Sequence, residues 1–150
     1  MSEITVIPFN VHHLQVMDIR GEEMTSLFGL DNGLDIVNAL ISGKGEAGTF
    51  LFDGRILFCA GFKELWPGVM EGWIIPSVWI KSAPKRTFIR CIRQYVEATA
   101  KAFNVHRFQS PALDNELHER FMGFLGFQKE GTMRQYTHDK KDYCMYARIF

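Results

Sequence analysis

Three cations flank the start of the strongest helical pattern in the sequence. Lys81, Lys85 and Arg86 lie in or just before the amphipathic stretch 84–103. The N-terminus of a helix presents backbone N–H groups and a partial positive charge, and both attract anions. These features favour an anion site at the start of the helix. The alternative interpretation is a set of solvated charges at a helix start, with Ser82 serving only as the cap.

Metal and nucleophile chemistry is not supported by the spacing of the other reactive residues. The five histidines are scattered or adjacent, as at His12–His13, and none lies at metal-ligand spacing from another His or Cys. No Gly-x-Ser-x-Gly elbow and no P-loop occurs. Cys59, Cys91 and Cys144 are far apart and set among apolar residues. We therefore expect three buried free thiols in a reducing compartment.

Length, charge and hydropathy bound the class of protein. A chain of 150 residues with 47% hydrophobic residues fits one domain spanning 1–150. The formal net charge is zero, which disfavours nucleic acid and anionic membranes as partners. We find no basic leader followed by an apolar run, and no stretch of about 18 apolar residues that could span a membrane. We expect a cytoplasmic protein without a membrane partner.

Hydrophobic periodicity predicts both strands and helices in the first half of the chain. Ile4–Phe9 alternates as a strand does, whereas Val11–Phe28 has helical spacing. A second helical stripe runs from Leu34 to Ile41, with Asp31 as its N-cap and Gly43 as its stop. A β-hairpin follows, in which the turn Asp53-Gly54 joins Gly48–Phe52 to Arg55–Phe62. After it comes a long strand, Val69–Ile80, which Pro76 interrupts.

The second half alternates helices and strands. Helical spacing and flanking Ser, Pro, Asn and Gly residues predict two amphipathic helices, at Pro84–Phe103 and Asn115–Leu125. Strands are expected at Arg107–Pro111, Gln128–Tyr136 and Tyr143–Phe150. This order of elements is typical of an α+β protein built around one mixed sheet.

The run from Asn115 to Arg134 resembles the second half of a GNAT acetyltransferase. In that family an Asn precedes a helix that stops at a Gly-Phe pair, here Gly126-Phe127, before a strand that begins with Glu-Gly, here Glu130-Gly131. The tail Asp142–Arg148 is similar to the last strand of the family. The resemblance implies the GNAT acyl-CoA N-acyltransferase fold, a central twisted mixed sheet of about six or seven strands flanked by about four helices.

A narrower resemblance points to a phage-type branch of this superfamily. Gly61-Phe62, Trp66-Pro67-Gly68, Trp73, Asp142-Tyr143 and Tyr146–Arg148 are similar to features of small GNAT-like internal virion or virion-assembly proteins of T7-like podophages. That branch implies virion proteins or self-association as partners, in the host cytoplasm or the virion.

The resemblance also implies an activity and its residues. An active member would transfer an acetyl group from acetyl-CoA to a small or protein amine. Glu71 or Glu64 would act as the base, although either is equally interpreted as an ordinary carboxylate on a strand. The cofactor contacts would be Ile80, Lys81, Ser82, Ala83, Lys85, Arg86, Thr87 and Asn115. Asn115 is also the expected N-cap of its own helix.

The sequence departs from the family in two places that matter for catalysis. The family loop has glycines that let the backbone approach the pyrophosphate, but here Ala83 and Lys85 occupy those positions and Pro84 removes an N–H donor. Many members of the family have a Tyr that acts as the general acid, and Met122 stands at its position here. Tyr136, Tyr143 or Tyr146 could substitute as the proton donor, although a tyrosine in a closing strand is more often a core aromatic. The alternative function is therefore a GNAT-fold protein without activity that serves as a structural or interaction module.

Overall fold

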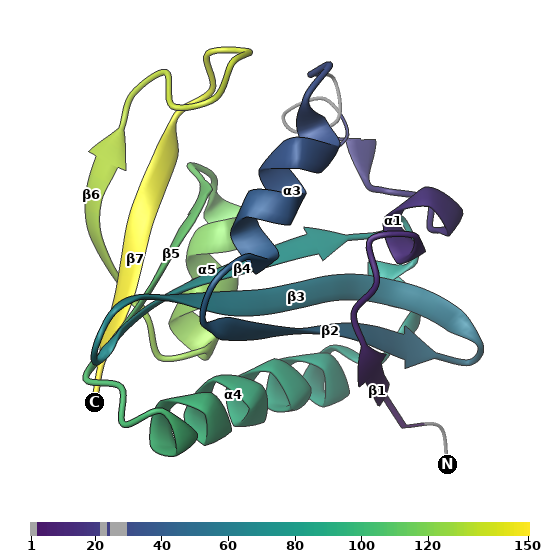
Figure 1. Ribbon diagram of the computed structural model, residues 1–150, viewed down its shortest axis with the longest axis horizontal. Helices are drawn as coiled ribbons and strands as arrows, with labels where there is room; N and C mark the ends of the chain where they lie inside the picture. The colour runs from purple at the N-terminus through teal and green to yellow at the C-terminus, as the bar shows by residue number, and fades with distance from the viewer. Residues whose placement is uncertain (1–2, 22–23, 25–29) are drawn as a thin grey trace. The chain divides into compact units, whose positions relative to one another are not determined.

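The computed structural model describes residues 3–21, 24 and 30–150 (Figure 1). These residues form two compact units. The first unit comprises Met1–Lys63 and Trp73–Phe88, and the second comprises Glu64–Gly72 and Ile89–Phe150. The chain passes between the units within strands and within a helix. That residues 1–150 make a single domain stays a prediction.

An antiparallel set of strands forms the sheet of the first unit. It consists of β1 (Thr5–Pro8), β2 (Gly45–Phe52) and most of β3 (Arg55–Trp66). The turn between β2 and β3 has positive φ at both central residues, 50° at Asp53 and 75° at Gly54. Such a turn matches the natural twist of a hairpin, which is why Asp-Gly predicts it. The predicted hairpin is confirmed, with both strands longer than expected.

The first unit contains the α-helices α1 and α3. α1 (His13–Val16) covers part of the helical pattern expected over 11–28, of which residues 22–23 and 25–29 lie outside the described residues. α3 (Gly33–Ile41) has Asn32 as its N-cap residue, so the prediction of Asp31 was wrong by one position. The Asn32 side chain makes no capping hydrogen bond, and the Asn32 carbonyl accepts the Ile36 N–H at 3.1 Å.

The two faces of β3 carry different parts of the core of the first unit. On one face Phe50 and Phe58 stack with ring centroids 4.3 Å apart, and Phe88 meets Phe58 edge-on at 5.3 Å. Phe50 and Phe58 are both fully buried. The other face contributes Cys59 to a cluster whose further members are Leu14, Met17, Ile19, Val37 and Ile75. Burial on both faces explains why the central part of β3 is almost entirely apolar.

The strand β4 (Val69–Pro76) is shorter than the sequence predicts. It ends at Pro76, which has no N–H for a further ladder bond. The next residue, Ser77, makes two hydrogen bonds to β3. Its N–H donates to the Leu57 carbonyl at 2.8 Å, and its hydroxyl donates to the Ile56 carbonyl at 2.6 Å. The predicted strand end at Ile80 was therefore wrong, and Ile80–Ser82 forms a short 3₁₀ helix, η2.

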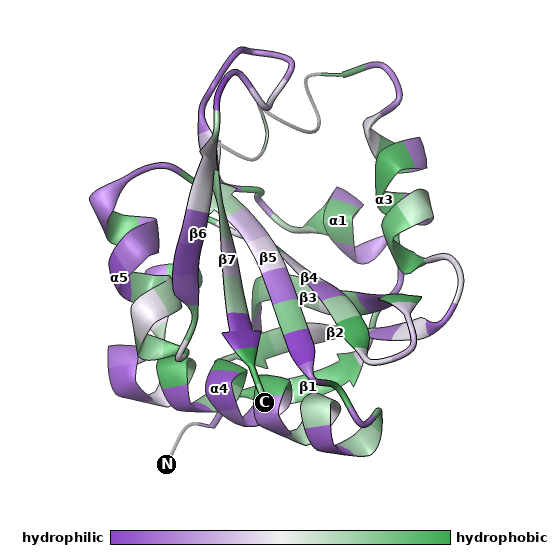
Figure 2. Cartoon of the chain, turned by 90° about the vertical axis from the view of Figure 1, so that its left-hand side faces the viewer, coloured by the Kyte–Doolittle hydropathy of each residue, from purple (hydrophilic) through white to green (hydrophobic). Residues whose placement is uncertain are grey.

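The second unit contains helices and three neighbouring strands (Figure 2). Its elements are the greater part of α4 (Lys85–Ala102), β5 (Arg107–Leu113), α5 (Glu116–Phe124), β6 (Gln128–Met133) and β7 (Tyr143–Ile149). β5 and β6 flank β7, and both pair with it antiparallel. β4 pairs in parallel with β5. The hydrogen-bonded order of the seven-stranded sheet is β1-β2-β3-β4-β5-β7-β6, so the predicted mixed sheet and α+β class are confirmed.

Candidate functional site

The predicted anion segment lies in the first unit. Ile80, Lys81 and Ser82 form η2, and Ala83 is buried directly after it. α4 begins at Lys85, so Ser82 is not the residue that flanks the helix, and the predicted Ser82 cap was wrong. Proline before the helix explains the difference, because its fixed φ suits a helix start.

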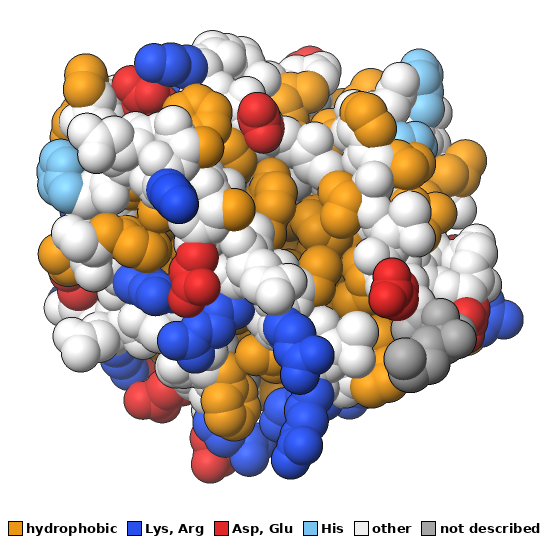
Figure 3. All heavy atoms as spheres, turned by 90° about the horizontal axis from the view of Figure 1, so that it is seen from below, with side chains coloured by type: hydrophobic (Ala, Val, Ile, Leu, Met, Phe, Trp, Pro, Cys, Tyr) orange, Lys and Arg blue, Asp and Glu red, His pale blue; other side chains and the backbone are white. Residues whose placement is uncertain are grey.

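The charges of this segment are exposed at the start of α4. Lys81, Lys85 and Arg86 are solvent-exposed, and Thr87 is half-buried. Figure 3 shows Lys and Arg side chains on the face seen from below, with Asp and Glu side chains among them. The first N–H groups of a helix have no acceptor within that helix. The positive side chains and the backbone N–H groups at the start of α4 therefore suit a phosphate. Pro84 lacks an N–H donor, however, and the side chains of Ala83 and Lys85 prevent the close backbone approach that glycines allow.

Glu71 is the candidate base whose surroundings the structure describes best. It is half-buried on β4 in the second unit, opposite Gln109 of β5. The Gln109 amide donates from Nε2 to Glu71 Oε1 at 3.2 Å. The parallel ladder between β4 and β5 covers three residue pairs, and Glu71 with Gln109 is the last of them.

Glu64, the other candidate base, is half-buried near the end of β3. The turn at Pro67 and Gly68, where φ is 85°, separates it from β4. Its assignment as a base stays a prediction, and the ordinary strand carboxylate remains the competing interpretation.

Asn115 caps α5 as predicted. Its Oδ1 accepts the backbone N–H of His118 at 2.8 Å and lies 2.6 Å from His118 Nδ1. The side chain is half-buried. Its capping role is thus confirmed, and its role toward acetyl-CoA stays a prediction.

Replacing Asn115 with alanine should lower the free energy of unfolding by about 1 kcal/mol, because a capped N–H loses its acceptor. Asn115→Asp keeps an acceptor and should retain stability. Thermal melts followed by circular dichroism would measure both. Equal melting temperatures for the Ala and Asp variants would contradict the capping role.

The tyrosines proposed as substitutes for the missing acid differ in their surroundings. Tyr146 is 2% exposed, and its buried hydroxyl has no hydrogen-bond partner among the residues that the structure describes. Burial raises the pKa of the Tyr146 phenol, so the hydroxyl keeps its proton at neutral pH. Tyr136 and Tyr143 lie ring to ring at 5.3 Å, and Tyr136 is exposed. Met122, at the position of the family's acid, is buried in α5.

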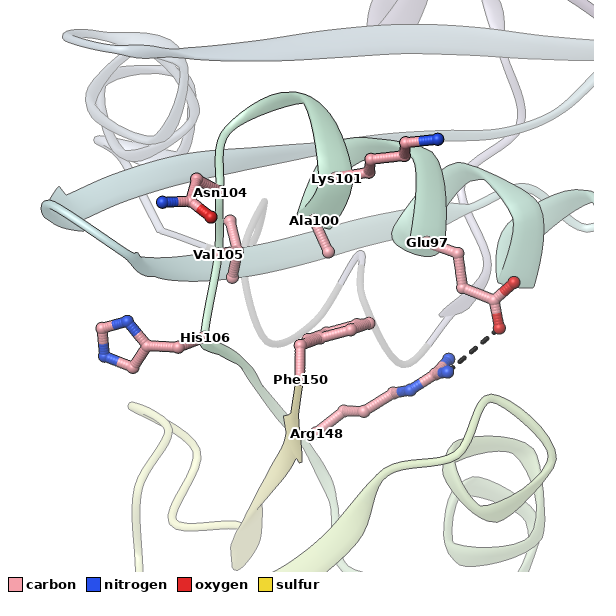
Figure 4. Close-up of a pocket in the computed structure, with 8 residues that line it drawn as sticks. All are labelled: Glu97, Ala100, Lys101, Asn104, Val105, His106, Arg148 and Phe150. Carbon is pink, nitrogen blue, oxygen red and sulfur yellow. Dashed lines mark hydrogen bonds and ion pairs between the residues drawn. The ribbon is translucent and has the colours of Figure 1, made fainter.

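A pocket of about 550 Å³ lies at the C-terminal end of α4 (Figure 4). Arg148 extends across it, donating to Glu97 Oε1 at 3.0 Å and to the Leu125 carbonyl at 3.1 Å. None of the predicted site residues lines this pocket, so it is separate from the candidate site. Its lining residues are Glu97, Ala100, Lys101, Asn104, Val105, His106, Arg148 and Phe150.

The expectation of three buried thiols is confirmed for two of them. Among the described residues no group of three His, Cys, Asp or Glu side chains could hold a metal ion. Cys59 and Cys144 are buried as predicted, whereas Cys91 is half-buried. Burial raises the pKa of the Cys59 thiol to about 11, which keeps it protonated. No helix in the described part of the chain is long and apolar enough to cross a membrane.

The sequence did not reveal the hydrogen-bonded residues that lead to Glu71 through Gln109. Arg107 donates from Nε to Gln109 Oε1 at 2.9 Å and forms a two-pronged ion pair with Glu130. The only available signal was the alternation of Arg107, Phe108 and Gln109, which places the two polar side chains on one face of β5. That signal does not reveal their partners on β4 and β6.

Comparison with known proteins identifies the fold. No family model matches the sequence, and no curated protein matches it. Solved structures do match, among them a GNAT-family acetyltransferase from Bacillus anthracis with a TM-score of 0.69 and 13% identity, covering 98% of this chain and 95% of the other. Ribosomal-protein-alanine N-acetyltransferase from Brucella melitensis matches with a TM-score of 0.70 and 10% identity, over 97% of this chain and 99% of that one.

A third match concerns the cofactor. A Salmonella typhimurium protein assigned as an acetyltransferase, and solved with acetyl-CoA, has a TM-score of 0.68 and 13% identity, covering 97% of this chain and 93% of the other. Identities this low establish the fold alone. The chain therefore has the fold of GNAT acetyltransferases, as the resemblance of Asn115–Arg134 implies.

Proposed function

We propose that the protein is an acyl-CoA-dependent N-acyltransferase of the GNAT superfamily that uses acetyl-CoA. The observation that carries the proposal is the likeness, along nearly the whole chain, to acetyltransferase structures, one of them solved with acetyl-CoA. Glu71 supports it as a half-buried carboxylate that accepts a hydrogen bond from Gln109 within the second unit. The unpartnered hydroxyl of Tyr146 is a second feature suited to a ligand.

The proposal assigns a task to each candidate residue. Bound acetyl-CoA would supply the acetyl group as a thioester. Lys81, Lys85 and Arg86 would hold its phosphates through side-chain contacts, in place of a glycine cradle. Glu71 would take the proton that the amine nitrogen loses as its bond to the carbonyl carbon forms. Tyr146 would give its proton to the sulfur as the carbon–sulfur bond breaks.

Reversing two charges at the start of α4 tests the cofactor assignment. The double variant Lys85→Glu/Arg86→Glu should weaken acetyl-CoA binding by about 10- to 100-fold. This loss corresponds to one hydrogen bond to a charged group, about 1.5–3 kcal/mol, because solvent screens exposed charges and the two contacts do not add in full. The loss should shrink as salt is added. Isothermal titration calorimetry would measure it.

Lys101→Glu, in the last turn of the same helix, is the control and should bind acetyl-CoA as the wild type does. Absence of binding heat for the wild-type protein at millimolar acetyl-CoA would refute the proposed function. An equal loss in both variants would refute the assignment of the phosphate site.

The alternative remains a GNAT-fold protein without activity, of the phage type, that acts as a virion or assembly module in the host cytoplasm or particle. The missing glycines and the buried Met122 favour it. Exposed apolar side chains such as Trp66, 61% exposed, and Ile149, 67% exposed, suit a partner surface. Light scattering after size exclusion tests this alternative, because a strict monomer with no captured partner would contradict it.

A further inference from the structure

A chain of side-chain hydrogen bonds joins residues of β4, β5 and β6 within the second unit and ends at Glu71. The register pairs Glu71 with Gln109 across the parallel ladder. Arg107 precedes Gln109 by two residues on the same strand, so both side chains leave the same face. Glu130 reaches this face from a register irregularity in β6, between Lys129 and Gly131.

The direction of each hydrogen bond follows from the chemistry of the groups. A guanidinium only donates, so the atom of Gln109 that faces Arg107 Nε at 2.9 Å must be the amide oxygen. The amide nitrogen then faces Glu71 and donates to Oε1 at 3.2 Å. Arg107 thereby decides which end of the Gln109 amide Glu71 meets.

Arg107 is itself held in place. Its two terminal nitrogens donate to the two oxygens of Glu130 at 3.0 and 2.6 Å. This contact raises the pKa of Arg107 and lowers that of Glu130, so both groups stay charged. Both side chains are partly exposed, so the ion pair contributes little to stability. Its main effect is to hold the Arg107 side chain in one orientation. A two-pronged contact fixes the plane of the guanidinium.

We propose that Gln109, oriented by Arg107 and Glu130, is a positioning residue that holds the Glu71 carboxylate through one oxygen and leaves the other oxygen to the reacting amine or its water. The inference rests on the proposed function, which makes Glu71 the base. Partial burial and then the negative charge of Glu71 raise the pKa of the Tyr136 phenol, which therefore keeps its proton at neutral pH.

Kinetics of Gln109 variants test the positioning role. Gln109→Leu removes the donor and should lower kcat by about 100-fold, the loss that a displacement of about 1 Å produces in a catalytic group. Gln109→Glu still accepts from Arg107 but sets a carboxylate against Glu71, and should lose at least as much. Acetyl-CoA affinity should stay unchanged in both. Gln128→Leu, an exposed position on β6, is the matched control and should keep wild-type kcat.

A second measurement does not depend on activity. The side-chain amide of Gln109 should give distinct ¹H–¹⁵N resonances that move in Glu71→Ala, whereas those of Gln128 should stay. Unmoved Gln109 resonances would overturn the proposal, and so would an active wild type in which Gln109→Leu matches Gln128→Leu. A wild type that neither binds acetyl-CoA nor acetylates an amine refutes the proposed function instead, and the resonances then decide whether Gln109 positions Glu71.

Discussion

Truncating Phe58 to alanine should cost about 3–5 kcal/mol of unfolding free energy, the usual loss for a buried phenylalanine. Phe58 is fully buried, stacks on Phe50 at 4.3 Å and receives the edge of Phe88 at 5.3 Å. Its removal leaves a cavity and ends both ring contacts. Since a domain of this size is stable by about 5–15 kcal/mol, this one change should remove a large share of the total.

Urea titration followed by tryptophan fluorescence would measure the loss as a lower midpoint. Phe124→Ala, at a side chain that is 48% exposed on α5, is the control and should shift stability by about 0.5 kcal/mol. Similar midpoints for the two variants would show that the Phe50–Phe58–Phe88 stack is not the core of the first unit.

Local patterns were sufficient where a single turn or cap decides the structure. Asp53-Gly54 accommodates the positive φ of its turn, and Asn115 provides a capping oxygen for the helix that follows. Both outcomes depend on residues within a few positions of each other, so the sequence was enough to predict them. The start of α3 shows the limit of this reasoning, because Asp31 and Asn32 are both capping types and composition does not choose between them.

Ends of elements were harder to predict where a distant strand supplies the partner. The strand expected to reach Ile80 ends at Pro76, and Ser77 then bonds to carbonyls of β3 some twenty positions earlier in the chain. The helix expected to use Ser82 as its cap begins after Pro84 instead. In both cases a proline fixed the boundary, and its effect on the neighbouring backbone exceeded the preference of the side chains nearby.

The surroundings of Glu71 were beyond the reach of sequence patterns. The hydrogen-bond chain joins Glu71 to Gln109, Arg107 and Glu130, which come from three strands. Its existence depends on the parallel register of β4 with β5 and on the irregularity in β6. Strand pairing of this kind is set by the whole fold, so a sequence alone names the carboxylate without the groups that orient it.

Glu71→Gln should lower kcat for amine acetylation by about 100- to 10,000-fold, the range that loss of a positioned base produces. The substitution preserves the size of the side chain but removes its capacity to accept a proton. Acetyl-CoA binding should not change, because the phosphate contacts are assigned to the start of α4. Release of free thiol from acetyl-CoA in the presence of an amine would measure the rate.

Glu64→Gln is the matched comparison, since Glu64 is the other carboxylate that the sequence offers as a base. Gln109 fixes one oxygen of Glu71, and a carboxylate held in one orientation loses less entropy when it accepts a proton in the transition state. We therefore expect Glu64→Gln to retain most of the activity. A larger loss in Glu64→Gln than in Glu71→Gln would move the base to β3, and the Gln109 contact would then have a structural role only.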